Sequence, residues 1–141
     1  MNILVLCTGN SARSILLESI LRVESGGEIT AFSAGSHPVG QVNPAALKLL
    51  ARKNHPTVGL RSKSWDEFAL NGALTMDLVI TVCGNAEAET CPIWPGAPRR
   101  AHWGVDDPAA VVGTQDQIDA AFEAAYAELQ SKARAFLALE R

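Results

Sequence analysis

The sequence predicts an α/β fold in which helices cover both faces of a parallel sheet. Three observations lead to this prediction. Short apolar runs of strand type alternate with longer stretches in which apolar residues recur at helical spacing. Apolar residues make up 48% of the 141-residue chain and charged residues 19%, so a sizeable buried core is expected. No repeat or low-complexity tract interrupts this pattern, and we expect a single domain over residues 1–141.

The first half of the chain is expected to contain two strands and two helices. Residues 2–7 hold an apolar run, typical of a strand that is covered on both faces. Apolar residues at helical spacing predict a helix over 14–24, which a pair of glycines ends, and 28–33 is the next strand. After a turn-rich loop, Asn43-Pro44 opens a helix that runs to about residue 53.

The second half contains shorter elements before a long final helix. Residues 55–60 fit a short strand, 65–70 a short helix, and 76–82 is the clearest further strand. A last short strand is expected over 99–103. The final helix begins with a capping box formed by Thr114 and Gln117. Its apolar stripe consists of Ile118, Phe122, Ala125, Leu129 and Phe136.

Composition and charge exclude several classes of protein. Twelve basic and fifteen acidic residues give a net charge of −3, which argues against a nucleic-acid or anionic-membrane binder. The apolar run near the start is too short for a membrane span or a signal peptide, so we expect a cytoplasmic protein. Three cysteines cannot form a fully paired framework, and in a reducing compartment they are more often catalytic, metal-bound or inert.

A loop suited to anions follows the first predicted strand. Ligands of such sheets bind beyond the carboxyl ends of the strands, where both Cys7 and Cys83 are expected to lie. In the segment Cys7-Thr8-Gly9-Asn10-Ser11-Ala12-Arg13-Ser14, small and turn-forming residues lead into a helix, so backbone N–H groups can cradle an oxyanion. Arg13 adds a planar cation suited to a tetrahedral anion. The helix terminus and Arg13 are expected to lower the pKa of Cys7 and make it a thiolate nucleophile, to which the Ser14 hydroxyl can donate a hydrogen bond.

This loop resembles the phosphate-binding loop of the low-molecular-weight protein tyrosine phosphatase superfamily and, more closely, that of the cytoplasmic arsenate reductases built on the same fold. The resemblance extends to Phe32-Ser33-Ala34-Gly35 and to His102-Trp103-Gly104-Val105-Asp106-Asp107-Pro108, and so covers nearly the whole chain. It implies a four-stranded parallel sheet with flavodoxin-like layering. Ala12 stands where several members have another cysteine.

A displacement at arsenic or phosphorus needs a proton donor for the leaving oxygen. The resemblance assigns this role to Asp107, directly before Pro108. The alternative is that Asp106 and Asp107 only start a short helix at Pro108, and we expect Asp106 to act as its cap.

Cys83 and Cys91 distinguish a reductase from a phosphatase. Reduction requires two electrons, which a second thiol supplies when it forms a disulfide with the first. By resemblance, Cys83 is the resolving cysteine and Cys91 the relaying cysteine. If the segment between them is helical, their Cα atoms lie about 12 Å apart, whereas a disulfide needs about 7 Å or less, so the segment must refold during the cycle. Two unrelated buried cysteines are the alternative, and the spacing of Cys83, Cys91 and His102 fits no ordinary zinc site.

The sequence predicts no organic cofactor and no metal centre. The resemblance does raise the question of a monovalent cation, because four residues match positions that bind one in some related reductases. These residues are Asn10, Glu18, Ser64 and Asp66.

We therefore expect a monomeric arsenate reductase that binds arsenate, with phosphate or sulfate as mimics, and receives electrons from thioredoxin or glutaredoxin. The alternative is a protein tyrosine phosphatase that uses Cys7, Arg13 and Asp107. Against it, Ala109 and the loop 35–40 lack the aromatic residue that would stack on phosphotyrosine. A further alternative is a non-catalytic oxyanion sensor or phosphocysteine carrier.

Overall fold

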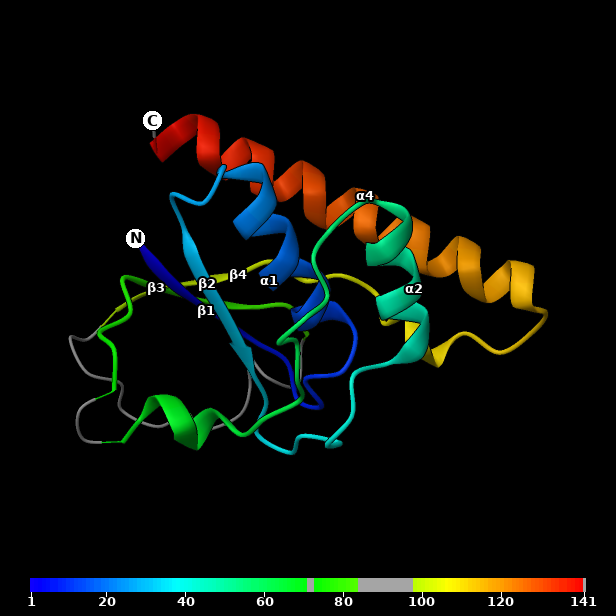
Figure 1. Ribbon diagram of the computed structural model, residues 1–141, viewed down its shortest axis with the longest axis horizontal. Coiled ribbons are helices and arrows are strands. Elements are labelled where there is room, and N and C mark those ends of the chain that lie inside the picture. The colour runs from blue at the N-terminus through cyan, green and yellow to red at the C-terminus, as the bar shows by residue number, and fades with distance from the viewer. Residues whose placement is uncertain (71–72, 84–97, 141) are drawn as a thin grey trace.

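A four-stranded parallel sheet lies at the centre of the computed structural model, which describes residues 1–70, 73–83 and 98–140 (Figure 1). Its strands are β1 (Asn2–Leu6), β2 (Thr30–Ala34), β3 (Leu78–Thr81) and β4 (Arg99–His102). They are arranged in the order β2-β1-β3-β4, and every neighbouring pair is parallel. The predicted sheet is confirmed, and β1 is a central strand whose residues 3–6 are fully buried.

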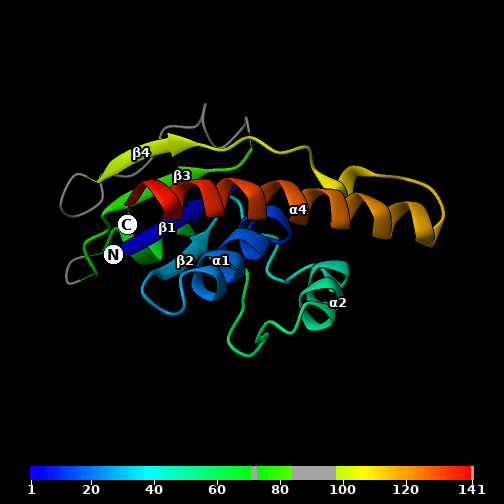
Figure 2. The same ribbon diagram turned by 90° about the horizontal axis from the view of Figure 1, so that it is seen from above.

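The α-helices of the described ranges lie on one face of the sheet, whereas the sequence predicted helices on both faces. α1 (Arg13–Glu24) packs against both β1 and the long α4 (Gln115–Glu140), and α2 (Pro44–Arg52) lies beside them (Figure 2). The larger core cluster is enclosed between these helices and the sheet. On the other face, a smaller cluster is covered by the 3-10 helix η1 (Trp65–Phe68). None of the helices in the described ranges is long and apolar enough to cross a membrane.

Local signals set the start of α2 and the start of α4. Asn43 caps α2 through its side chain, which accepts a hydrogen bond from the Ala45 N–H, and Pro44 is the first helical residue. At the start of α4, the Gln117 N–H donates to Thr114 Oγ1 and the Thr114 N–H donates to Gln117 Oε1, which confirms the predicted capping box.

The strand expected over 55–60 is wrong. Backbone dihedrals in the left-handed region at Asn54 and Gly59, with φ of 62° and 87°, turn the chain on both sides of this short segment. Val58, whose β-branched side chain favoured a strand, is 95% exposed. The helix expected over 65–70 is the 3-10 turn η1, which Ser64 caps by accepting a hydrogen bond from the Asp66 N–H.

Candidate functional site

The loop 7–12 joins the end of β1 to the start of α1, as the sequence predicts. Its carbonyl groups bind backbone N–H groups of the neighbouring segment 37–43. These hydrogen bonds join Thr8 O to His37 N at 3.0 Å, Gly9 O to Val39 N at 3.1 Å, and Ser11 O to Asn43 N at 2.9 Å. Because the C=O and N–H of one peptide group point in opposite directions, the N–H groups that follow are turned away from this segment. This orientation is the one that the predicted anion cradle requires, and anion binding by the loop stays a prediction.

Gly35, at the end of β2, lets the loop lie close to the sheet. A Cβ atom at this position would lie 2.4 Å from Thr8 O and 2.6 Å from Cys7 O, which is closer than atoms can approach. The Gly35 N–H donates to Lys63 O at 2.9 Å. The glycine of the Phe32–Gly35 motif is therefore needed for this close packing rather than for an unusual dihedral angle.

Asn10 supports the loop from inside the protein. Its backbone is left-handed, with φ of 45°, and its side chain is fully buried. Its Nδ2 donates to Ser14 Oγ at 2.8 Å and to Ser33 Oγ at 2.9 Å, while its Oδ1 accepts from the Lys63 N–H at 2.9 Å. The side chain of Asn10 is therefore a structural support, and Ser14 is held at the start of α1.

A cavity of about 220 Å³ lies at this loop. Its walls come from three segments of the chain: the loop and the start of α1, the segment 36–42, and the segment after β4. The lining residues are Cys7, Gly9, Asn10, Ser11, Ala12, Arg13, Val39, Asp107 and Ala109. Most of the predicted oxyanion-binding residues, with Cys7, Arg13 and Asp107, therefore surround one space.

Cys83 lies beside Cys7, although 75 residues separate Cys83 from Thr8 along the chain. β1 and β3 are neighbouring strands, so their carboxyl ends place both buried cysteines at the same edge of the sheet. The two thiols are close enough for Cys83 to act on the pKa of Cys7. Cys83 Sγ also accepts a hydrogen bond from the Thr8 N–H at 3.4 Å and lies 3.7 Å from Thr8 Oγ1.

The pKa of Cys7 is raised above its ordinary value in this arrangement. The Cys83 side chain is the main cause and burial adds to it, whereas Arg13 and the Gly9 N–H act in the opposite direction. The lowered pKa expected from the sequence is wrong for the protein with both thiols present. Arg13 does act to lower the pKa of Cys7, as the sequence predicts. The local sequence, however, does not show that the Cys83 thiol lies beside Cys7 and raises its pKa.

Arg13 and Asp107 form an ion pair at the wall of the cavity. The Arg13 Nη1 donates to the Val105 carbonyl at 2.9 Å, and its Nη2 lies 3.6 Å from Asp107 Oδ2. The other oxygen of Asp107 accepts a hydrogen bond from the Ala109 N–H at 2.9 Å, so Asp107 caps the 3-10 helix η2 (Pro108–Ala110). The cap was expected at Asp106. Asp107 instead performs the capping with Oδ1 and directs Oδ2 toward Arg13.

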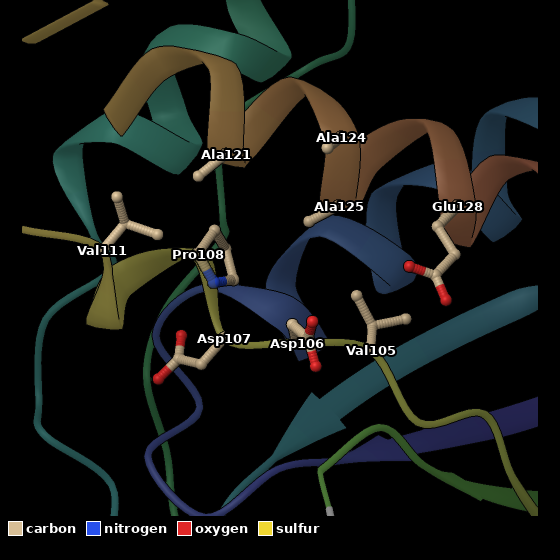
Figure 3. A pocket seen from close by; sticks show the side chains of 9 residues that line it. All are labelled: Val105, Asp106, Asp107, Pro108, Val111, Ala121, Ala124, Ala125 and Glu128. Carbon is tan, nitrogen blue, oxygen red and sulfur yellow. The ribbon is translucent and has the colours of Figure 1, made fainter. Parts of the chain in front are cut away.

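Asp106 belongs to a different part of the surface. It lines a second cavity of about 240 Å³ between the segment 105–111 and α4. Figure 3 shows the Asp106 carboxylate beside Val105, while the Asp107 side chain is set apart from it. Of these two consecutive carboxylates, only Asp107 lines the cavity that contains Cys7.

The four residues considered for a monovalent cation do not form a ligand set. Asn10 and Glu18 are buried, but Asp66 is exposed and Ser64 uses its hydroxyl to cap η1. The carboxylate of Glu18 already has two cationic neighbours: Arg22 Nη2 lies 3.3 Å from Oε2 and Lys63 Nζ lies 3.9 Å from Oε1. Within the described parts of the chain, no group of three or more His, Cys, Asp or Glu side chains is placed to hold a metal ion.

Cys91 and the segment between the two distal cysteines lie outside the described residues, so the predicted refolding of that segment stays a prediction.

Sequence reasoning missed Lys63 and the carbonyl of Val105. It also missed the contact of 2.7 Å between Thr81 Oγ1 and His102 Nδ1 at the ends of β3 and β4. None of these three features has a local sequence signal, because each depends on segments brought together by the fold.

Comparison with known proteins agrees with this geometry. The family model described as low molecular weight phosphotyrosine protein phosphatase matches residues 2–141. An arsenate reductase of Bacillus subtilis (strain 168) is 37% identical over 131 residues, which cover 93% of this chain and 91% of that protein.

Solved structures have the same fold. One, described as an arsenate reductase in the phosphate binding state, superposes with a TM-score of 0.77 at 21% identity and covers 97% of this chain and 96% of that one. The thioredoxin-dependent arsenate reductase of Corynebacterium glutamicum has a TM-score of 0.59 at 24% identity, and the match covers 94% of this chain and 61% of that one. The cysteine and arginine of the loop, the sheet order and these matches lead to one conclusion: the chain belongs to the low molecular weight phosphotyrosine protein phosphatase family.

Proposed function

We propose that this protein reduces arsenate to arsenite through a thiol–disulfide relay of Cys7, Cys83 and Cys91. The observation that carries the proposal is the position of Cys83 beside the oxyanion cavity, where its Sγ accepts a hydrogen bond from the N–H of Thr8, the residue that follows Cys7. A phosphatase needs one cysteine there, because water can resolve its covalent intermediate. A second thiol beside the first is the group that a two-electron reduction requires. The arsenate reductase of B. subtilis, at 37% identity, supports the same activity.

In the first step, arsenate binds the loop 8–14 beside Arg13, an oxygen of the bound anion takes the proton of the Cys7 thiol, and the resulting thiolate attacks arsenic. A bond forms between sulfur and arsenic, and one oxygen leaves as water after Asp107 donates a proton. The carboxyl group that donates must be the one near the cavity, and Asp107 Oδ2 lies on that side, 3.6 Å from Arg13 Nη2. Arg13 is held in place by its bond to Val105 O, and its guanidinium lines the cavity in which the anion would bind.

In the second step, the Cys83 thiolate attacks the sulfur of Cys7. The disulfide forms as the sulfur–arsenic bond breaks, and the bonding electron pair remains on arsenic, which leaves as arsenite. The hydrogen bond from the Thr8 N–H favours the thiolate of Cys83. Cys91 then attacks Cys83, which releases the Cys7 thiol and moves the disulfide to Cys83–Cys91, where an external dithiol such as thioredoxin or glutaredoxin reduces it. No organic cofactor or metal takes part in these steps.

The walls of the cavity favour a small oxyanion over an aryl phosphate. Val39 and Ala109, at the positions where an aromatic ring would stack on phosphotyrosine, offer no aromatic surface. Slow hydrolysis of small aryl phosphates is still expected, because arsenate and phosphate have the same shape and charge. That side activity provides the control for the experiment below.

The experiment compares the wild type with Cys83→Ser. We expect the variant to lose multiple-turnover arsenite production with thioredoxin, thioredoxin reductase and NADPH, while hydrolysis of a small aryl phosphate continues, because only reduction needs the second thiol. Repeating the wild-type assay with glutathione and glutaredoxin identifies the electron donor. If both activities survive the substitution equally, the relay is refuted and a phosphatase becomes the better assignment.

The paired thiols also predict how Cys7 titrates. In Cys83→Ala, the midpoint of Cys7 alkylation should move to lower pH, because the main cause of its raised pKa is gone. Adding Arg13→Ala should move the midpoint back up, since Arg13 is the largest cause that lowers it. The rate of iodoacetamide modification against pH, located at Cys7 by peptide mass, measures both. A wild-type midpoint below that of Cys83→Ala would contradict the pairing.

A further inference from the structure

Beneath the oxyanion loop lies a buried cation that the proposed reaction does not use. The Lys63 side chain is 8% exposed and the Glu18 side chain 3%. Lys63 Nζ donates to Arg61 O at 2.9 Å and lies 3.9 Å from Glu18 Oε1. A buried ammonium and a buried carboxylate are each costly alone, so these two groups depend on each other.

This pair is connected to the loop by hydrogen bonds. Glu18 Oε1 accepts from Ser33 Oγ at 2.5 Å, and Ser33 Oγ in turn accepts from Asn10 Nδ2. From its other side, the backbone N–H of Lys63 donates to Asn10 Oδ1. Lys63 therefore reaches Asn10 twice, once directly through its main chain and once through Glu18 and Ser33.

The charges around Glu18 leave no place for an additional cation. A bound potassium or sodium ion at Asn10 and Glu18 would lie near both Lys63 and Arg22, whose positive groups already flank the carboxylate. Burial lowers the pKa of Lys63, and the charge of Glu18 opposes this effect. The carboxylate thus helps to keep the ammonium charged inside the protein.

We propose that the Lys63 ammonium is a built-in cation: it neutralises Glu18, keeps Asn10 and the loop in their binding geometry, and makes oxyanion binding independent of potassium or sodium. Lys63 is a positioning residue, since it lines no part of the cavity that contains Cys7. The inference rests on the proposal that the loop binds an oxyanion, but not on the thiol relay.

The test measures inorganic phosphate binding by titration calorimetry, and thermal unfolding, in potassium chloride and in choline chloride at equal ionic strength. For the wild type, we expect the dissociation constant and the melting temperature to be the same in both salts. In choline chloride, Lys63→Met should bind phosphate about ten-fold more weakly, because small displacements of positioned groups are costly. Potassium should restore much of this loss by entering the space that the ammonium leaves. Lys48→Met, at an exposed position on α2, is the matched control and should behave as the wild type.

Several outcomes would overturn the proposal. One is a wild type that binds phosphate more tightly, or melts at a higher temperature, in potassium than in choline. Another is a Lys63→Met variant that binds as the wild type does, or one that is weakened equally in both salts, since the lysine would then act only through packing. If Lys63→Met does not fold, the comparison of the wild type in the two salts still tests the proposal. The double variant Glu18→Gln/Lys63→Met removes both charges, and its phosphate affinity should be the same in potassium and in choline. A wild type that binds no phosphate in either salt would contradict the proposed function instead, and the melting temperatures would still test the cation.

Discussion

Two neighbouring residues of α1 begin two different buried polar networks. Glu18 connects to Lys63, Ser33 and Asn10 under the oxyanion loop. The next residue, Ser19, has its Oγ 2.8 Å from His55 Nδ1, and His55 Nε2 lies 2.8 Å from the hydroxyl of Tyr126 on α4. The first network contains charges and ends at the candidate site. The second joins α1 to the chain after α2 and to α4, and ends in the helical core.

The two networks differ in how their buried polar groups are stabilised. In the His55 network, neutral groups satisfy one another, and the rings of His55 and Tyr126 also pack edge to face at 5.7 Å. Such a network adds stability and connects helices. In the Glu18 network, a charge is retained in the interior next to the site, which costs stability unless it is neutralised. We therefore expect substitutions in the Glu18 network to affect both folding and oxyanion binding, and substitutions in the His55 network to affect folding alone.

The largest effect is expected for Asn10→Ala. It removes the partners of Ser14, Ser33 and the Lys63 N–H in the interior, and it leaves a left-handed backbone without the side chain that tolerates it. We expect a loss of about 4 kcal/mol in the free energy of unfolding and a large loss of phosphate affinity. Urea unfolding and titration calorimetry measure these quantities.

Asn54→Ala is the matched control, because Asn54 is also left-handed, with φ of 62°, but is exposed. It should cost only about 1 kcal/mol and leave phosphate binding unchanged. If the two variants lose the same stability, the buried bonds of Asn10 contribute nothing.

A smaller effect is expected for Tyr126→Phe. This change removes the hydroxyl next to His55 Nε2 and keeps the ring, so about 1 kcal/mol of stability should be lost through one buried hydrogen bond. Phosphate affinity and arsenate reduction should be those of the wild type. A reduced affinity for phosphate would show that the two networks are coupled through α1, contrary to the comparison.

The smallest effect concerns pH. Burial lowers the pKa of His55 below its usual 6.5, although Glu24 opposes this. Below about pH 6.5, the unfolded chain therefore takes up a proton that the folded protein does not, and stability falls as the pH decreases. Urea unfolding between pH 5 and 8 should give a shallower decline for His55→Gln than for the wild type. Equal slopes would mean that His55 does not contribute to this dependence.

Much of the fold follows from local sequence signals. The apolar run in β1, the cap at Asn43-Pro44 and the capping box at Thr114 and Gln117 act over a few residues, and the structure contains each of them. Residues 55–60 show the limit of this reasoning. Their composition favoured a strand, but the turns at Asn54 and Gly59 and the bonds of His55 to two helices decide the conformation.

The loop with Cys7 and Arg13 between a strand and a helix could be predicted from the sequence because its residues are contiguous, and its role as an anion cradle stays a prediction. What depends on contacts between distant segments could not be predicted. The pKa of Cys7 rises because β3 brings Cys83 beside it. Asp107, and not Asp106, caps η2 and faces Arg13. Lys63 lies in the interior next to Glu18. The chemical groups of the site can be predicted from the sequence, since they belong to short motifs. Their pairing, the pKa of Cys7 and the supporting charges follow from the folded chain, because they depend on burial and on distances between segments far apart in the sequence.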